Sequence, residues 1–261
     1  MTEQCNNTNR LDAPWGILID RSNPLRFSFE GTVIEGYQGD TIASALIANQ
    51  QWLMSRSFKY HRPRGPLTMA GQDANTLVQL PSAPNTLADK YPASNGLQVL
   101  GQNYRGSLHY DRLAVNGLLS RFLPVGFYYK AFFRPRGVWQ YWVKLIRKQA
   151  GLGVIDVDHQ PQYRDKQYLF CDVAVVGAGP AGLSAALAAA DAGADVILID
   201  ENTILGGSSN YSRLSDKHSA QVADIKKQVE SHPQIRIYLN ATCNAWHAEH
   251  WLAVVTEKRL Y

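Results

Sequence analysis

The chain has 261 residues, of which 45% are hydrophobic and 18% are charged, with a formal net charge of +4 at pH 7, a composition typical of a folded globular protein. Three scattered cysteines, Cys5, Cys171 and Cys243, exclude a disulfide framework and any Cys-x-x-Cys metal pattern, as expected for a reducing compartment. The polar start of the chain and the lack of any run of about 18 apolar residues predict neither a signal peptide nor a membrane span, so we expect a cytoplasmic protein.

The first predicted region, residues 11–100, reads as a small α+β domain. Apolar and polar residues alternate in 25–30, Gly31 provides a turn, and 32–37 continues as a second strand. Asp40 is then predicted to cap a helix over 41–49. A hairpin followed by a helix that packs across it is typical of the β-grasp fold.

The second region, residues 101–166, is a basic and aromatic connector. Its part 101–150 contains nine Lys or Arg against one acid, and 11 of the 27 aromatic residues of the chain. Glycines and prolines interrupt any long amphipathic helix, at Pro124, Gly126, Pro135 and Gly137. We favour packing against a neighbouring domain or subunit over a membrane surface or nucleic-acid binding, two functions that the same composition can also serve.

The third region, residues 167–261, has an α/β pattern. An apolar strand leads into Gly-x-Gly-x-x-Gly at 177–182, an alanine-rich helix follows, and a second apolar strand ends at Asp200. Further on we predict a helix, a strand and a hairpin, over 219–229, 235–239, 242–246 and 251–256. This order predicts the first half of a Rossmann-like FAD/NAD(P)-binding domain.

Each part of this motif has a chemical reason. Gly177 permits the tight turn, Gly179 lets the backbone approach a pyrophosphate, and Gly182 lets the helix pack closely on the strand. Asp200 follows Gly182 by 18 residues, near the spacing of a carboxylate that binds a ribose hydroxyl. No basic residue stands there to receive a 2′-phosphate, which favours NAD or FAD over NADP. The alternative is an ordinary βαβ unit with a small-residue turn.

The candidate cofactor-binding residues form one set along this motif. They are Gly177, Gly179, Pro180, Ala181, Gly182, Asp200, Glu201, Asn202, Gly207 and Ser208.

The sequence nominates no catalytic residue and no metal ligand. His247 and His250 have i, i+3 spacing, but they flank a predicted turn rather than one face of a helix. His61 lies in the basic cluster 58–64, which we expect to contact a neighbouring domain or subunit. Cys171 and Cys243 occupy strand positions, where buried small apolar side chains are expected.

Several segments resemble the N-terminal part of the α subunit of heterotetrameric sarcosine oxidase, and the related opine and proline dehydrogenase subunits are similar in outline. The similar segments are 20–31, 37–46, 57–65, Pro124–Lys130 and Ala150–Gly153. The order of ferredoxin-like domain, connector and dinucleotide fold agrees as well, so the resemblance covers nearly the whole chain.

The resemblance implies an oxidoreductase subunit that binds NAD, with FAD as the alternative in the same site. It implies a complex with β, γ and δ subunits that oxidatively demethylates sarcosine to glycine. It also implies FAD on the β subunit, FMN at the α/β interface, and tetrahydrofolate binding by a C-terminal region that these 261 residues do not include.

One departure from the related iron–sulfur domains concerns their cysteine ligands. In the places of three clustered cysteines the chain has Thr68, Asp73 and Thr76, and 79–103 contains no cysteine. Hydroxyls and one carboxylate do not replace thiolates. We therefore expect a ferredoxin-like domain without an Fe–S cluster.

The other departure concerns length, because the predicted dinucleotide fold is incomplete at Tyr261. We expect a fragment, a truncated product or a split subunit that is inactive alone. Two further functions remain open: half of an FAD-dependent reductase of the pyridine nucleotide-disulfide type, and a non-catalytic scaffold.

Overall fold

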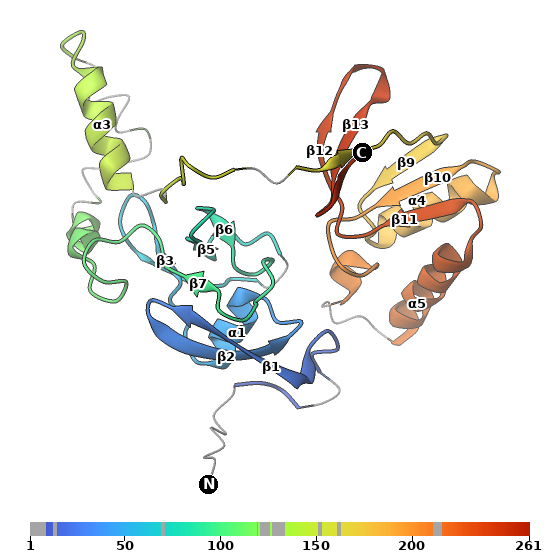
Figure 1. The fold of residues 1–261 in the computed structure, drawn as a ribbon, viewed down its shortest axis with the longest axis horizontal. Coiled ribbons are helices and arrows are strands. Elements are labelled where there is room, and N and C mark those ends of the chain that lie inside the picture. Colours follow the sequence, from blue (N-terminus) through green and yellow to red (C-terminus); the bar gives the residue numbers. More distant parts are fainter. Residues whose placement is uncertain are drawn as a thin grey trace. The chain divides into compact units, whose positions relative to one another are not determined.

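The computed structural model describes residues 9–12, 15–68, 71–118, 120, 126, 134–150, 153–160, 163–210 and 216–261. The chain forms two compact units, Met1–His159 and Gln160–Tyr261 (Figure 1). Apart from Gly126, the motif Pro124–Lys130 lies outside the described residues, as do 151–152 of the motif Ala150–Gly153. None of the helices in the described part of the chain has the length and apolar character that a membrane span requires.

The first unit is built on a long antiparallel hairpin. β1 (Asp20–Phe29) and β2 (Thr32–Gln38) pair with Phe27 opposite Ile34, and Glu30 and Gly31 turn the chain with φ of 51° and 80°. Two consecutive residues with positive φ form the kind of turn that matches strand twist. The predicted hairpin is thus present, and its alternation places Leu25, Phe27 and Phe29 in the core.

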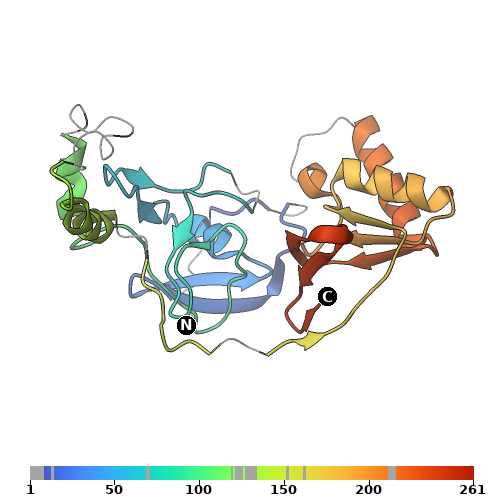
Figure 2. The ribbon, with the colours of Figure 1, turned by 90° about the horizontal axis from the view of Figure 1, so that it is seen from above.

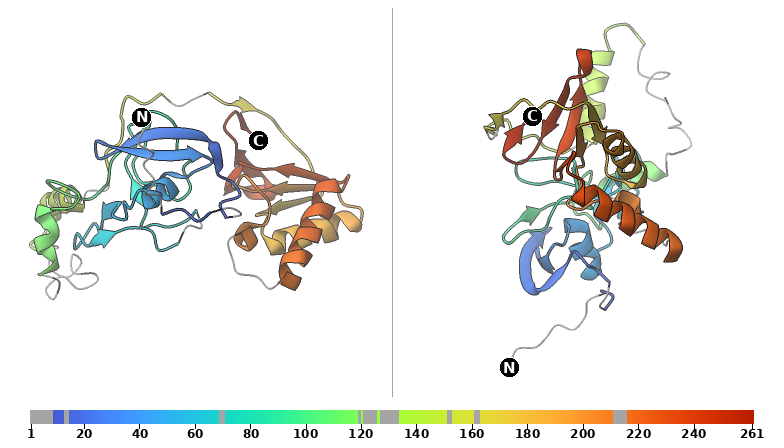
Figure 3. Two further views of the ribbon diagram at one scale, coloured as in Figure 1. Left: turned by 90° about the horizontal axis from the view of Figure 1, so that it is seen from below. Right: turned by 90° about the vertical axis from the view of Figure 1, so that its right-hand side faces the viewer.

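A helix packs on one face of this hairpin, as Figure 3 shows. It is α1 (Ile42–Ala48), and its N-cap is Thr41, which forms a capping box with Ser44. The prediction that Asp40 is the cap is therefore wrong by one residue.

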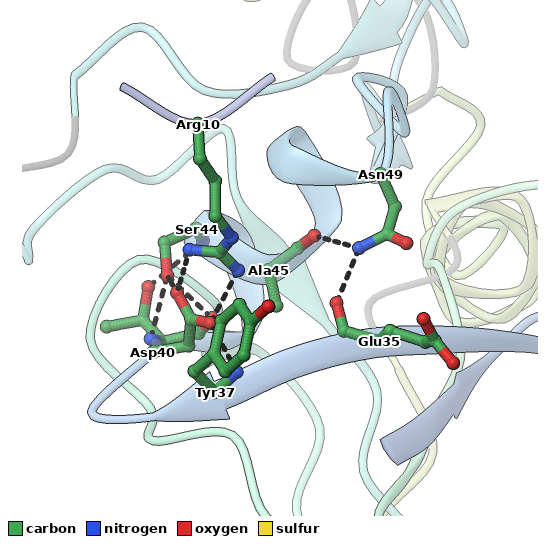
Figure 4. Close-up of polar contacts among 8 residues, drawn as sticks. Arg10, Glu35, Tyr37, Asp40, Ser44, Ala45 and Asn49 are labelled. Carbon is green, nitrogen blue, oxygen red and sulfur yellow. Dashed lines mark hydrogen bonds and ion pairs between the residues drawn. The ribbon is translucent and has the colours of Figure 1, made fainter. Parts of the chain in front are cut away.

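Asp40 has a different role, as the centre of a buried polar cluster (Figure 4). Its carboxylate accepts two hydrogen bonds from Arg10, at 3.0 and 2.6 Å, one from the Ser44 hydroxyl at 2.6 Å and one from the Tyr37 N–H at 2.8 Å. The side chain is fully buried, so these four donors replace its hydration.

Short elements complete the first unit. They are β3 (Ser55–Arg56), β4 (Pro63–Arg64), β5 (Leu77–Val78), β6 (Thr86–Leu87), β7 (Gln98–Val99), η1 (Arg112–Gly117) and α3 (Trp139–Ala150). β7 runs parallel to β1, so the main sheet has the order β2-β1-β7.

His61 lies at the end of the β3–β4 hairpin, and its side chain points into the unit. It is 2% exposed, and its Nδ1 lies 2.6 Å from a carboxylate oxygen of Asp111. Arg56 beside it donates to the carbonyls of Leu108, His61 and His109. The His61 side chain thus contacts its own unit, while the prediction that the cluster 58–64 meets a neighbouring domain or subunit stays a prediction.

Gly153 and Val154, which follow α3 in the sequence, contact Gln79 and its neighbours in the first unit. The side chain of Gln79 accepts from the Val154 N–H at 2.8 Å and donates to the Val154 carbonyl at 3.1 Å. Gly153 has φ +82°, and a Cβ there would lie 2.4 Å from both Gln102 Nε2 and Pro84 Cβ. The glycine is therefore required for this close contact.

The second unit contains a parallel sheet covered by helices on one face. β9 (Val173–Val176), β10 (Val196–Ile199) and β11 (Ile235–Tyr238) have the order β11-β10-β9. α4 (Pro180–Asp191) connects the first two strands and α5 (Asp216–Ser231) the next two, and both helices lie on the same face (Figure 2). Small alanines on α4 let it approach the sheet closely, against buried Val196 and Leu198.

A four-stranded sheet adjoins the opposite face, through contacts of Ile197 and Ile199 with Val254. Its order is β12-β13-β14-β8, and it is formed by β12 (Thr242–Trp246), β13 (Leu252–Val255), β14 (Arg259–Leu260) and β8 (Asp165–Lys166). η4 (Ala248–His250) connects β12 and β13, as the predicted hairpin requires. The three-part division of the chain remains a prediction, but β8 shows that 165–166 pair with the second unit.

Candidate functional site

The glycine turn between β9 and α4 is the centre of the candidate site. Gly177 has φ +100°, and its N–H donates to the Ile199 carbonyl at 2.7 Å. A Cβ at Gly182 would lie 1.8 Å from the Gly177 carbonyl oxygen. Gly177 therefore serves backbone conformation and Gly182 serves packing, the roles that the motif predicts.

Gly179 has a different environment. Its φ is −72°, and no described atom outside its immediate neighbours lies within 4 Å of the position that a Cβ would take. It is the N-cap of α4, and no side chain of the described residues caps this helix. The N–H groups at the start of α4 thus have no capping side chain among the described residues, and N–H groups at helix starts bind phosphate in other proteins.

A second backbone segment closes on this turn from the loop after β10. A Cβ at Gly207 would lie 2.9 Å from the Gly179 Cα, and the Gly206 N–H donates to the Ala178 carbonyl at 2.8 Å. Gly207 begins the short helix η3 (Gly207–Asn210). The two glycine-rich segments are thus in direct contact, through residues that lie 28 positions apart in the sequence.

Asp200 connects these parts. It directly follows β10, is 7% exposed, and accepts from the Ala178 N–H through Oδ2. Its Oδ1 accepts from the Asn202 N–H at 2.7 Å and from the Asn202 side-chain amide at 2.9 Å. Both carboxylate oxygens therefore bind the protein itself.

The remaining predicted residues surround this core of the site. Glu201 is half-buried, while Pro180, Ala181, Asn202 and Ser208 are exposed. The structure thus gathers Gly177, Gly179, Gly182, Asp200, Asn202 and Gly207 through direct contacts, and among the described residues no such contact joins Ser208 to them.

Sequence reasoning missed two residues here. Ala178 contributes through its backbone groups, and Lys226 of α5 lies over Gly206 while its Nζ donates to Asn210 at 2.7 Å. The only signal for Ala178 is its place between the two glycines, because a backbone contact does not depend on side-chain identity.

The site offers backbone N–H groups without a side-chain cap at the start of α4, but little acid–base chemistry among the described residues. No group of three or more His, Cys, Asp or Glu able to hold a metal ion occurs among the described residues. Burial raises the pKa of the Cys171 thiol, which disfavours the thiolate.

The predicted cluster-ligand places in the first unit form a separate polar network. Asp73 accepts from the N–H groups of Leu67, Thr68 and Asn75, at 2.6, 2.9 and 2.9 Å. Burial alone would raise the pKa of Asp73, but these hydrogen bonds outweigh it and hold that pKa below its ordinary value. The Thr76 hydroxyl lies 2.8 Å from the Asp73 carbonyl and 3.0 Å from a carboxylate oxygen of Asp89.

Two protein-family models match the chain. Residues 22–104 match a 2Fe-2S iron-sulfur cluster binding domain, and residues 172–231 match an FAD dependent oxidoreductase. These matches confirm the oxidoreductase class and the coarse fold, a ferredoxin-type domain followed by a flavoprotein-type α/β domain.

The first match corrects a prediction. We expected a domain without an Fe–S cluster, and the match to a 2Fe-2S binding family contradicts that expectation. The donor set is nevertheless unlike that of a cluster site, since residues 22–104 contain no cysteine and Asp73 and Thr76 are occupied by internal hydrogen bonds. The side chains at these places therefore do not fit a 2Fe-2S cluster.

Curated relatives agree with the second match. The chain is 43% identical over 238 residues to sarcosine oxidase subunit alpha of Rhizobium meliloti (strain 1021), covering 88% of this chain and 24% of that protein. It is 32% identical over 190 residues to sarcosine oxidase subunit alpha of Corynebacterium sp. (strain P-1), covering 73% of this chain and 16% of that protein. The chain thus spans a quarter or less of the curated relatives that it matches.

A solved structure supports the fold. L-proline dehydrogenase from P. horikoshii superposes with a TM-score of 0.52 and 18% identity, covering 92% of this chain and 39% of that one. Identity at that level speaks for the fold alone. The sequence relatives confirm that this chain is related to the alpha subunit of sarcosine oxidase.

Proposed function

We propose that the chain is the N-terminal part of a sarcosine-oxidase-type α subunit, whose second unit binds an adenine dinucleotide. The proposed architecture is a β-grasp domain, a basic connector and the first half of a Rossmann-like domain. The whole enzyme would oxidatively demethylate a secondary amine, with sarcosine as the first candidate because the relatives carry that name.

The observation that carries the proposal is the open space at Gly179. A Cβ on Gly179 would meet no described atom within 4 Å, and α4, which begins after Gly179, has no capping side chain among the described residues. A pyrophosphate placed there would accept hydrogen bonds from the N–H groups of the first turn and benefit from the helix dipole. Asp200 and Glu201, after the neighbouring strand, lie where the motif places the adenosine ribose.

The chain itself would bind and orient the dinucleotide. The bound group would supply hydride or electron transfer, and the residues of this chain would hold its phosphates and ribose. NAD is our first candidate, while the match of 172–231 to an FAD dependent oxidoreductase specifically favours FAD as the second.

Partner subunits would complete the enzyme. We propose a hetero-oligomer with β, γ and δ subunits, with FAD and FMN on or shared with the partners and with tetrahydrofolate bound by a region outside these 261 residues. The connector is the proposed contact surface, since α3 has Lys144 and Arg147 but no acid, and Tyr141 on it is 75% exposed. Cytoplasmic location remains part of the proposal.

The test is nucleotide binding by the purified chain. Calorimetric titrations with NAD, FAD and ADP-ribose should show saturable binding of at least ADP-ribose, weaker than micromolar because the nicotinamide or flavin end lacks its enclosing half. If the purified protein is yellow and releases FAD on denaturation, the proposed ligand is FAD rather than NAD. A chain that binds none of the three would refute the proposed site and leave the scaffold function.

Sarcosine turnover is the second measurement. The chain alone should show none, and co-expression with a flavin-bearing partner subunit should yield a complex that co-purifies and oxidises sarcosine. Sarcosine turnover by the chain alone would contradict the proposal that partner subunits are needed to complete the enzyme.

A further inference from the structure

Both oxygens of the Asp200 carboxylate accept hydrogen bonds from the chain itself, which binding a ribose does not require. Oδ2 accepts from the Ala178 N–H, and Oδ1 accepts from the backbone and side chain of Asn202. At 7% exposure the carboxylate has exchanged most of its hydration for these three N–H donors.

The bond to Ala178 reaches the middle of the glycine turn. Ala178 lies between Gly177 and Gly179, is fully buried, and accepts from the Gly206 N–H through its carbonyl. Its peptide groups are thus held on one side by Asp200 and on the other by the second glycine segment. Gly179, the next residue, is the N-cap of α4 and faces the open space.

Glycines confer no rigidity by themselves, because they adopt many backbone conformations. Gly177 at φ +100° needs external contacts to hold the turn in one shape. A charge-assisted hydrogen bond from the neighbouring strand provides such a contact, and it is stronger than one between neutral groups.

We propose that Asp200 is a positioning residue, which holds the Gly177–Gly179 turn in its phosphate-binding shape through the Ala178 N–H. This inference rests on the proposed function and extends it. Asp200 then acts on the phosphate end of the ligand through the backbone, in addition to any contact with the ribose.

The test compares two ligands that share adenine and ribose but differ in phosphate. Affinities of the purified 261-residue chain for adenosine and ADP-ribose are measured by NMR titration, for the wild type, Asp200→Asn and the matched neighbour Glu201→Gln. In Asp200→Asn the affinity for ADP-ribose should fall at least fivefold more than the affinity for adenosine. In Glu201→Gln both affinities should fall by the same factor, because only the ribose contact is changed.

Two results would overturn the inference. One is an equal loss for both ligands in Asp200→Asn, which would make Asp200 a ribose contact alone. The other is unchanged binding of ADP-ribose by a folded Asp200→Asn protein. A wild type that binds neither ligand would refute the proposed function itself, and this inference with it.

Hydrogen exchange in the wild type gives an independent measurement if Asp200→Asn does not fold. The Ala178 amide should exchange slowly without ligand and remain protected with saturating ADP-ribose, because its bond to Asp200 persists. Exchange of this amide at the rate of an exposed loop would overturn the inference.

Discussion

Replacing two glycines of the same turn with alanine should have opposite consequences for stability and binding. A Cβ at Gly182 would lie 1.8 Å from the Gly177 carbonyl oxygen, so α4 must move by more than 1 Å to relieve the contact. A Cβ at Gly179 meets no described atom within 4 Å, and its φ of −72° suits alanine.

These distances set the expected changes in unfolding free energy and melting temperature. Overpacking against backbone costs about 1–3 kcal/mol or more, and the gain in helix propensity from glycine to alanine, about 1 kcal/mol, offsets part of it. Because a contact of 1.8 Å with backbone is severe, we take the upper end of that cost, about 3 kcal/mol, which leaves a net loss of about 2 kcal/mol. The melting temperature of the second unit should then fall by about 8–16 °C in Gly182→Ala. Gly179→Ala should leave melting within about 2 °C of the wild type, because the new methyl group contacts only solvent.

For the affinity for ADP-ribose the order should be reversed, with Gly179→Ala the more strongly affected variant. In Gly179→Ala the methyl group takes the space of the phosphate, and the affinity for ADP-ribose should fall at least tenfold, about 1.4 kcal/mol. Differential scanning calorimetry and isothermal titration check the two quantities on the same samples. The reasoning is refuted if Gly179→Ala binds ADP-ribose as the wild type does, or if Gly182→Ala melts at the wild-type temperature.

Three further predictions concern the first unit. Asp40→Ala leaves the nearly buried Arg10 without its carboxylate, so urea unfolding should show a loss of about 3–5 kcal/mol, and a loss below 1 kcal/mol would contradict the cluster of Figure 4. Gly153→Ala should cost at least 1 kcal/mol more than Gly96→Ala, since both have positive φ but only Gly153 has close neighbours; equal urea midpoints would contradict a packing role. Asp73 has a pKa below its ordinary value of 3.8, so its stabilisation is present above that pH and is lost as pH falls through the folded pKa. The difference in unfolding free energy between wild type and Asp73→Asn should therefore shrink below about pH 4, and a pH-independent difference would count against the hydrogen bonds to Asp73.

The pattern of apolar residues predicted the strands and helices well where burial of those residues determines the local structure. The alternation in 25–30 became β1 because its apolar side chains bury against α1, and the hairpin at 242–256 formed around η4 as expected. The helix predicted for 219–229 extends over Asp216–Ser231, since helix ends depend on caps more than on periodicity.

Contacts between distant backbone groups were beyond sequence reasoning. The motif located Gly177 and Asp200, but the hydrogen bond of Asp200 to Ala178 depends on the register of β9 against β10. The burial of the His61 side chain was not foreseen for a similar reason, because its partner Asp111 lies 50 residues away in the sequence. The helix cap was misplaced because Asp40 and Thr41 are both good caps, and only the tertiary contact with Arg10 decides between them.

The hydrogen bonds that Ala178 makes through both of its backbone groups have a kinetic consequence. A turn already held in one shape needs no ordering when a ligand arrives, so little conformational entropy is lost on binding. Association should then follow a single second-order phase whose rate rises linearly with ligand concentration, without the plateau that a slow loop closure imposes. Differences in affinity among dinucleotides should accordingly reside in how fast each one leaves.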